Sequence, residues 1–257
     1  MKHQLWMRCS TKNSDTTEIK SSIDVAEQIL PQIINFVKNA KLNLNVPTLS
    51  QDGRVNSSLQ EKIVTDFIQN SADIKLLLNN YQLQLLIPEE REWFDFCIFD
   101  NKYEIFIPVN IKISALKTAD SVSSKKGLYF ACTGVLPYNN SYGFDDLEDS
   151  FKTNKWTEFY KKLKRDVDKH TERDYYFLIV NKNNSEDVFL TSLKTLKVIS
   201  PNGSNLPFLC NWDLNRERVF RSHKESRKFL LQKFYESLKL SSDSILLGLK
   251  ILRKLGK

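Results

Sequence analysis

The chain has few of the residues that build metal centres or disulfide frameworks. Its four cysteines, Cys9, Cys97, Cys132 and Cys210, lie far apart and form no CxxC pair, which argues against both a zinc site and a set of disulfides. Only three histidines occur, and none has the spacing of metal ligands. Isolated cysteines of this kind are typical of proteins in a reducing compartment, so we expect a cytoplasmic protein.

Long apolar segments are also missing. No run reaches the ~18 apolar residues that a membrane-spanning helix needs, and the first six residues, MKHQLW, lack the apolar stretch of a signal peptide. We therefore expect no membrane association. Seven glycines and seven prolines among 257 residues argue against low-complexity or repeat proteins. The 41% hydrophobic content is enough for a substantial core, so we expect one domain over residues 1–257.

The positive charge is concentrated at the C-terminal end. From Leu214 to Lys257 there are 12 Lys and Arg and 4 Asp and Glu, a balance of +8, which leaves −1 for the rest of a chain whose net charge is +7. A surface that contacts phosphates needs such an excess. We predict that residues 214–257 form a basic helical part that faces DNA, and the alternative is a solvated basic helix.

Two helices are predicted in the first 80 residues. Apolar residues at helical spacing indicate a helix over residues 22–38, with Pro31 as a kink or a break. A second helix is expected to start after Asn56 or Ser57, either of which is a good N-terminal cap. Its apolar stripe continues towards residue 67.

After Tyr81 the apolar pattern alternates, which indicates strands at residues 82–87, 93–99 and 103–113, the last two joined by a turn. Elements predicted further along the chain are a helix over 145–168, a buried strand over 175–180, and helices over 226–238 and 243–255. This order predicts an α/β fold in which helices flank a mixed central β-sheet.

The most informative residues lie on two neighbouring strands, at residues 93–113. Asp95 stands alone among apolar residues in the run WFDFCI, where a carboxylate is costly without a partner. In the run IPVNIKI, alternation places Asn110 and Lys112 on the same face. An acid, an amide oxygen and a lysine at one end of a hairpin can bind Mg²⁺ and position a water against a phosphodiester. We therefore predict the catalytic hairpin of a metal-dependent nuclease.

This layout resembles the PD-(D/E)xK nuclease superfamily, and in particular its type II restriction endonucleases. In that family a helix precedes a hairpin that supplies an acid and then an (Asp/Glu)-x-Lys on the adjacent strand. Asp95 matches the first acid and Lys112 the lysine, and Asn110, 15 residues after Asp95, takes the place of the second acid. Asn departs from the majority pattern, but some members carry it. The run DGRVNSS before Glu61 looks like the loop and helix start that approach DNA.

The resemblance covers roughly residues 51–180 and implies a cofactor and partners. The cofactor is Mg²⁺, with Mn²⁺ as a substitute, and no nucleotide cofactor is expected. The substrate is double-stranded DNA with a short palindromic target, read by a homodimer.

Each site residue has a predicted chemical role. Asp95 is the anionic Mg²⁺ ligand, and the side-chain oxygen of Asn110 or the backbone carbonyl of Ile111 completes the protein's share of the site. Lys112 holds or polarises the attacking water and contacts the scissile phosphate. Glu61 adds a second carboxylate if its helix packs beside the hairpin.

Structural interpretations of the same residues stay open. Asp95 and Lys112 could form a buried ion pair without a catalytic role. Glu61 could belong to a capping box with Ser58. Glu104, which shares the face of Lys112 on the same strand, is a further candidate acid.

DNA contacts are predicted at basic and short polar side chains. These are Arg54, Ser57, Lys125, Lys126, Asn139, Asn140, Asn202, Asn205, Arg216, Arg218, Arg221 and Lys224.

Three other function classes are compatible with the sequence. A repair or junction-resolving nuclease could have the same core. A non-catalytic DNA-binding protein on a decayed nuclease scaffold is suggested by Asn110, although Lys112 argues against decay. An RNA-binding module is disfavoured because the aromatic strand motifs of RNA platforms are missing.

Overall fold

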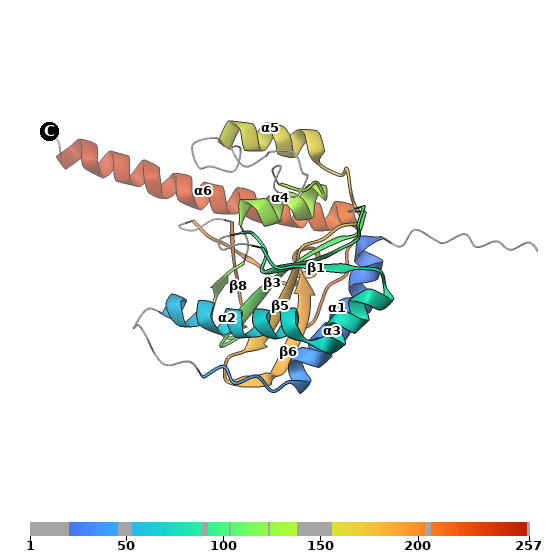
Figure 1. Cartoon of the computed structure of the whole chain (residues 1–257). Helices are drawn as coiled ribbons and strands as arrows, with labels where there is room; N and C mark the ends of the chain where they lie inside the picture. The colour runs from blue at the N-terminus through green and yellow to red at the C-terminus, as the bar shows by residue number, and fades with distance from the viewer. Residues whose placement is uncertain are drawn as a thin grey trace, which may run out of the picture.

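The computed structural model describes residues 21–45, 53–88, 92–102, 104–122, 124–137, 156–203 and 207–255. At its centre is a five-stranded sheet of order β1-β2-β3-β5-β6. The strands are β1 (Gln84–Leu86), β2 (Phe96–Phe99), β3 (Phe106–Ser114), β5 (Tyr176–Asn181) and β6 (Asn184–Ser192). β3 and β5 are parallel and the other neighbours antiparallel. Helices cover both faces of this mixed sheet (Figure 1), so the predicted fold class is confirmed.

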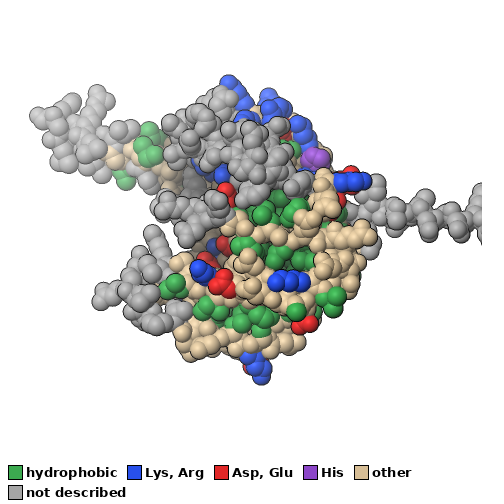
Figure 2. Space-filling view, in the orientation of Figure 1, with side chains coloured by type: hydrophobic (Ala, Val, Ile, Leu, Met, Phe, Trp, Pro, Cys, Tyr) green, Lys and Arg blue, Asp and Glu red, His purple; other side chains and the backbone are tan. Residues whose placement is uncertain are grey.

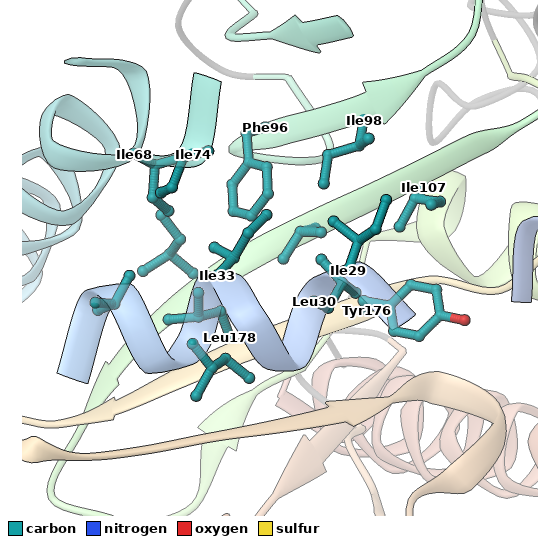
Figure 3. Close-up of a cluster of buried hydrophobic side chains, with 14 of the residues drawn as sticks. Ile29, Leu30, Ile33, Ile68, Ile74, Phe96, Ile98, Ile107, Tyr176 and Leu178 are labelled. Carbon is teal, nitrogen blue, oxygen red and sulfur yellow. The ribbon is translucent and has the colours of Figure 1, made fainter. Parts of the chain in front are cut away.

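One face of the sheet is covered by three helices, α1 (Ser22–Asn39), α2 (Gly53–Asn70) and α3 (Ala72–Asn80). Figure 3 shows apolar side chains of α1 beside side chains of the strands, among them Ile29, Leu30, Ile33, Phe96, Ile98, Ile107, Tyr176 and Leu178. Burial of each such side chain contributes about 1.5–3 kcal/mol relative to exposure. This core fixes α2 against β3.

The first helix begins where the sequence predicts and passes through Pro31 without a break. Ser21 Oγ accepts a hydrogen bond from the Asp24 N–H (3.1 Å), and the Asp24 carboxylate accepts one from the Ser21 N–H (3.3 Å). This capping box satisfies donors that the first turn leaves free.

The other face of the sheet is covered by α4 (Lys125–Thr133), α5 (Trp156–Asp166) and α6 (His223–Leu255). A second sheet of order β4-β8-β7 lies beside them and is built from β4 (Asp120–Ser121), β8 (Phe208–Cys210) and β7 (Ser200–Pro201). Short 3₁₀ helices follow β6 and β8, at Leu193–Thr195 and Asp213–Asn215. A second apolar core fills the space between this layer and the central sheet.

Several predicted boundaries are wrong. The two predicted C-terminal helices are one continuous helix, α6, because the polar residues between them include no proline or glycine that would end a helix. The second helix begins at Gly53 rather than after Asn56 or Ser57. α5 ends at Asp166, two residues before the predicted end, and residues 145–155 of the predicted helix lie outside the described part. None of the helices in the described ranges is long and apolar enough to cross a membrane.

Candidate active site

Asp95 marks the point where β2 and β3 part. Its N–H donates to the Val109 carbonyl (2.9 Å), and its carboxylate Oδ2 accepts a hydrogen bond from the Ile111 N–H (2.5 Å). Regular pairing starts one residue later, with Phe96 opposite Val109. The Asp95 side chain therefore takes the place of a further β2 backbone group and is held against β3.

Asn110 and Lys112 project from β3 beside this carboxylate. Burial alternates along the strand: Val109 and Ile111 are buried under α1–α3, whereas Asn110 and Lys112 are half-buried on the opposite face, as the alternation predicts. Asn110 Oδ1 is itself buried and has no hydrogen-bond partner among the described residues. A buried acceptor without a donor costs about 1–3 kcal/mol, so this oxygen is a vacant position for a ligand.

The Ile111 backbone completes this group of oxygens. The N–H and C=O of one strand residue point to the same side, and the Ile111 N–H points to Asp95. Its carbonyl therefore also faces the space beside β3 that lies before the first residue of β2, Phe96.

Glu61 joins the site from a different element. It is half-buried in the third turn of α2, the helix that packs on β3. Because α2 starts at Gly53, Ser58 already lies inside the helix and cannot cap it. The capping-box interpretation of Glu61 is therefore wrong.

The charges at the site are unbalanced. Burial raises the pKa of Glu61 to about 7 from 4.5; Lys112 opposes this rise, whereas Asp95 and Asp120 add to it. Burial also raises the pKa of Asp95, against the opposing effects of Lys112 and the Ile111 N–H. Glu61 therefore lies near Lys112, Asp95 and Asp120, and Lys112 also lies near Asp95. The site favours an additional positive charge.

Lys112 does not form a salt bridge with either of the acids near it. Within the described part of the chain, none of the ion pairs of 4.0 Å or less joins Lys112 to Asp95 or Glu61. Asp95 and Lys112 are thus close enough to interact electrostatically without forming a direct ion pair. The ammonium group lies near both acids and can still contact a substrate.

Asp120 was not among the predicted site residues. It lies on the two-residue strand β4, and its Oδ2 accepts a hydrogen bond from Trp212 Nε1 (2.7 Å), 92 residues away. No local motif marks this acid, so only the long-range contact could identify it. Glu104, by contrast, is exposed just before the start of β3, away from Asn110 and Lys112. The structure does not bring Glu104 into the site.

The N-terminus of α4 borders the same region. Ser124 caps this helix by accepting a hydrogen bond from the Gly127 N–H (3.2 Å). Lys126 lies 4.0 Å from Glu92, which precedes Asp95 by three residues. Lys125 is half-buried, and burial lowers its pKa. A helix N-terminus with two lysines is a favourable environment for phosphate, and contact of both residues with DNA stays a prediction.

The three predicted DNA-binding arginines of the C-terminal part have partners inside the molecule. Arg216 forms a bidentate pair with Asp187 (2.8 and 2.6 Å), and Arg218 forms one with Glu27 (2.7 and 2.6 Å). Arg221 donates to the Leu196 carbonyl (2.9 Å). These pairs hold elements of the fold together, and contact of the three arginines with DNA stays a prediction. Lys224 is exposed on α6.

The other predicted contacts divide into two groups. Asn202 is only 5% exposed and its N–H donates to Ser237 Oγ (3.0 Å), so it cannot read a base edge as predicted. Ser57 is half-buried in α2. Three asparagines, Asn139, Asn140 and Asn205, lie outside the described residues, as does the side chain of Arg54.

The donor set at β3 suits a hard cation. In the described ranges, no three His, Cys, Asp or Glu side chains converge into a complete metal centre. The available donors are instead the Asp95 carboxylate, the unpaired Asn110 Oδ1, the Ile111 carbonyl and, from α2, Glu61. All four are oxygen ligands, which Mg²⁺ prefers. With so few carboxylates, these donors would bind a cation weakly until phosphate oxygens add to them.

No protein-family model matches the chain, and no curated protein matches it significantly. The functional argument therefore rests on the residues and their geometry.

Proposed function

We propose that the chain is a metal-dependent nuclease. The observation that carries this proposal is a group of three residues where β2 and β3 stop pairing. The Asp95 carboxylate accepts a hydrogen bond from the Ile111 N–H, and the buried Asn110 Oδ1 has no hydrogen-bond partner among the described residues. Lys112 lies on the same face of β3 as Asn110. More particularly, we propose a type II restriction endonuclease that cleaves double-stranded DNA at a short specific sequence. The resemblance of these residues and of the helix before them to that family supports this choice.

The roles follow from the chemistry of the side chains. Asp95, Asn110 and the Ile111 carbonyl would hold Mg²⁺, with Glu61 as the second carboxylate. The cation would supply the positive charge that neutralises charge developing on the phosphate. Lys112 orients the attacking water and contacts the scissile phosphate.

Binding of duplex DNA would use the edges of the site. Lys125, Lys126 and the N-terminus of α4 are suited to a flanking phosphate. Lys224 is an exposed candidate on α6. A palindromic target would be read by a homodimer, in which each copy cleaves one strand.

The decisive experiment is digestion of a fully sequenced, unmethylated phage DNA with wild type, Lys112→Ala and Lys75→Ala. Lys75 is an exposed lysine of α3 and controls for the loss of one positive charge. We expect discrete fragments with Mg²⁺ or Mn²⁺ and none in EDTA. Lys112→Ala should lower the rate by about 10²–10⁴-fold, and Lys75→Ala should leave it unchanged.

Other outcomes select the other function classes. Cleavage of branched or damaged DNA irrespective of sequence would indicate a repair or junction-resolving nuclease. Tight, salt-sensitive binding without cleavage by any variant would indicate a decayed scaffold, in which Asn110 has replaced the second acid. Cleavage that survives Lys112→Ala would refute the assignment of the site.

A further inference from the structure

A small pocket lies at the edge of the central sheet, between the starts of α1 and α6. Ile23 of α1, Tyr176 of β5, Ser192 of β6 and His223 of α6 are among the residues that line it, and Figure 1 shows the starts of α1 and α6 on the same side of the molecule. Its volume of about 120 Å³ is well below the ~300–1,000 Å³ of sites for drug-sized ligands, so it fits a group of a few heavy atoms. None of the described residues that line it belongs to the candidate active site.

Basic side chains outnumber acidic ones in this pocket. Lys194, Arg218 and Arg221 line it together with Glu27 and Asp174, and Figure 2 shows basic and acidic side chains and a histidine close together on the side of the molecule where α6 begins. Both acids already accept hydrogen bonds from the protein: Arg218 donates two to Glu27 (2.7 and 2.6 Å), and the Lys194 N–H donates one to Asp174 Oδ1 (3.3 Å). The excess of basic groups favours a small anion as the ligand.

Tyr176 directs a hydroxyl without a partner into the pocket. Its side chain is only 1% exposed, and its ring packs in the apolar core beside α1. Figure 3 shows the hydroxyl at the end of this ring pointing away from the other side chains of that cluster. The Tyr176 hydroxyl has no hydrogen-bond partner among the described residues. Because buried hydroxyls are normally hydrogen-bonded, this donor indicates a ligand.

Arg221 supplies further donors. Its Nη1 donates to the Leu196 carbonyl (2.9 Å) and more weakly to two other carbonyls. Its Nε and Nη2 have no hydrogen-bond partner within the part of the chain that the structure describes. A guanidinium group matches two oxygens of a phosphate or a carboxylate, so Arg221 and Tyr176 together offer donors to more than one oxygen of an anion.

His223 adds an acceptor to these donors. Burial, with a smaller effect of Lys194, lowers the pKa of His223 to about 4, so the ring carries one proton at neutral pH. His223 Nε2 lies 2.7 Å from the Asp168 carboxylate, which places this proton on Nε2. The remaining nitrogen, Nδ1, is buried and lacks a hydrogen-bond partner among the described residues. A ligand that satisfies Nδ1 must itself carry a hydrogen-bond donor.

We propose that this pocket binds a phosphate group that carries a protonated oxygen, either inorganic phosphate or a phosphate monoester. Tyr176 and Arg221 donate to its deprotonated oxygens, and His223 Nδ1 accepts from its P–O–H group. Sulfate at neutral pH and the phosphodiesters of a DNA backbone have no such proton, so both should bind poorly. The site goes beyond the proposed nuclease function and does not depend on it.

The test is calorimetric titration of the full chain at pH ~7 with inorganic phosphate or sulfate at equal ionic strength, without Mg²⁺ or DNA. We expect one saturable phosphate site per chain and weaker binding of sulfate. Tyr176→Phe removes only the hydroxyl and should weaken phosphate binding about tenfold or more. Tyr235→Phe, at a tyrosine of α6 that is 61% exposed, should have no effect. The absence of saturable binding, equal affinity for sulfate, or unchanged binding by Tyr176→Phe would overturn the proposal.

Thermal unfolding separates a binding role of Tyr176 from a structural one. Without phosphate, Tyr176→Phe should be at least as stable as wild type, because it removes a buried hydroxyl that has no partner. Saturating phosphate should reverse this order, since only wild type gains the full stabilisation by the ligand. A variant that is less stable than wild type by the same amount in both conditions would overturn the proposal.

Short nucleotides identify the source of the phosphate. A dinucleotide with a 5′-phosphate that binds wild type and not Tyr176→Phe would support a nucleic acid end as the ligand. Binding of inorganic phosphate alone would support free phosphate. Equally tight binding of the dinucleotide with a 5′-hydroxyl would mean that a phosphodiester is recognised, and would overturn the role of His223.

Discussion

Replacing Glu61 by Gln tests the electrostatic description of the site. The pKa of this carboxyl is raised to about 7 from 4.5, chiefly by burial. Because one pKa unit corresponds to about 1.4 kcal/mol, ionised Glu61 destabilises the folded state by at most about 3 kcal/mol, and by less where solvent reaches it. Gln keeps the size of the side chain and carries no charge.

The size of this stability difference depends on pH. Below 4.5 the carboxyl is neutral in both states, and the folded protein suffers no penalty. Between 4.5 and about 7 the folded state binds more protons than the unfolded state, so stability falls as pH rises. Above about 7 the whole penalty is present. Glu61→Gln should therefore be more stable than wild type at pH ~8.5 by about 2–3 kcal/mol, and much closer to it at pH ~5.

Urea unfolding at the two pH values measures this difference. Asp66→Asn, a change at an exposed carboxylate of the same helix, controls for the loss of one negative charge. A stability difference between Glu61→Gln and wild type that is the same at both pH values would refute the reasoning. Adding Mg²⁺ at the higher pH should stabilise wild type more than Glu61→Gln, because the cation offsets the charge that the variant lacks.

Four further predictions concern packing and binding. Arg218→Ala should destabilise the fold by about 1–3 kcal/mol in urea unfolding, because it leaves Glu27 without its partner, and should leave the salt dependence of DNA binding unchanged in filter binding. Gly134→Ala should cost more than about 1 kcal/mol in thermal unfolding, since Gly134 has φ +65° and a Cβ there would clash with backbone. Gly248→Ala, in open space, should be neutral or stabilising by up to ~1 kcal/mol. In Lys112→Ala, Mg²⁺ at constant ionic strength should tighten duplex binding measured by fluorescence anisotropy, and an unchanged affinity would contradict a metal site.

Apolar periodicity was enough to predict four of the five strands of the central sheet, all except β6. The period-two segments gave β2 and β3 within a few residues, and alternation put Asn110 and Lys112 on one face. Apolar periodicity did not predict where the helices begin and end. The C-terminal helix was divided in two because polar serines resemble a loop, although nothing in them stops a helix.

Contacts between distant residues could not be predicted from composition. The charge count correctly found an excess of basic residues after Leu214, but it could not tell a free arginine from a paired one. Arg218 meets Glu27, 191 residues away, and this pairing removes it from the surface available to DNA. Asp120 was missed for the same reason, since its partner Trp212 lies 92 residues further along the chain.

The molecule as a whole is positively charged, whereas the region of the candidate site is acidic. The chain carries +7 overall, yet Lys112 lies near two acids, Glu61 and Asp95, and Asp120 lies near Glu61. A phosphate is attracted to the molecule as a whole and repelled at this point when the acids are ionised. Only a cation bound among these oxygens would change the local sign. If the proposed function is right, the overall positive charge favours capture of a nucleic acid, and the acidic site requires a cation before it can act on a phosphate.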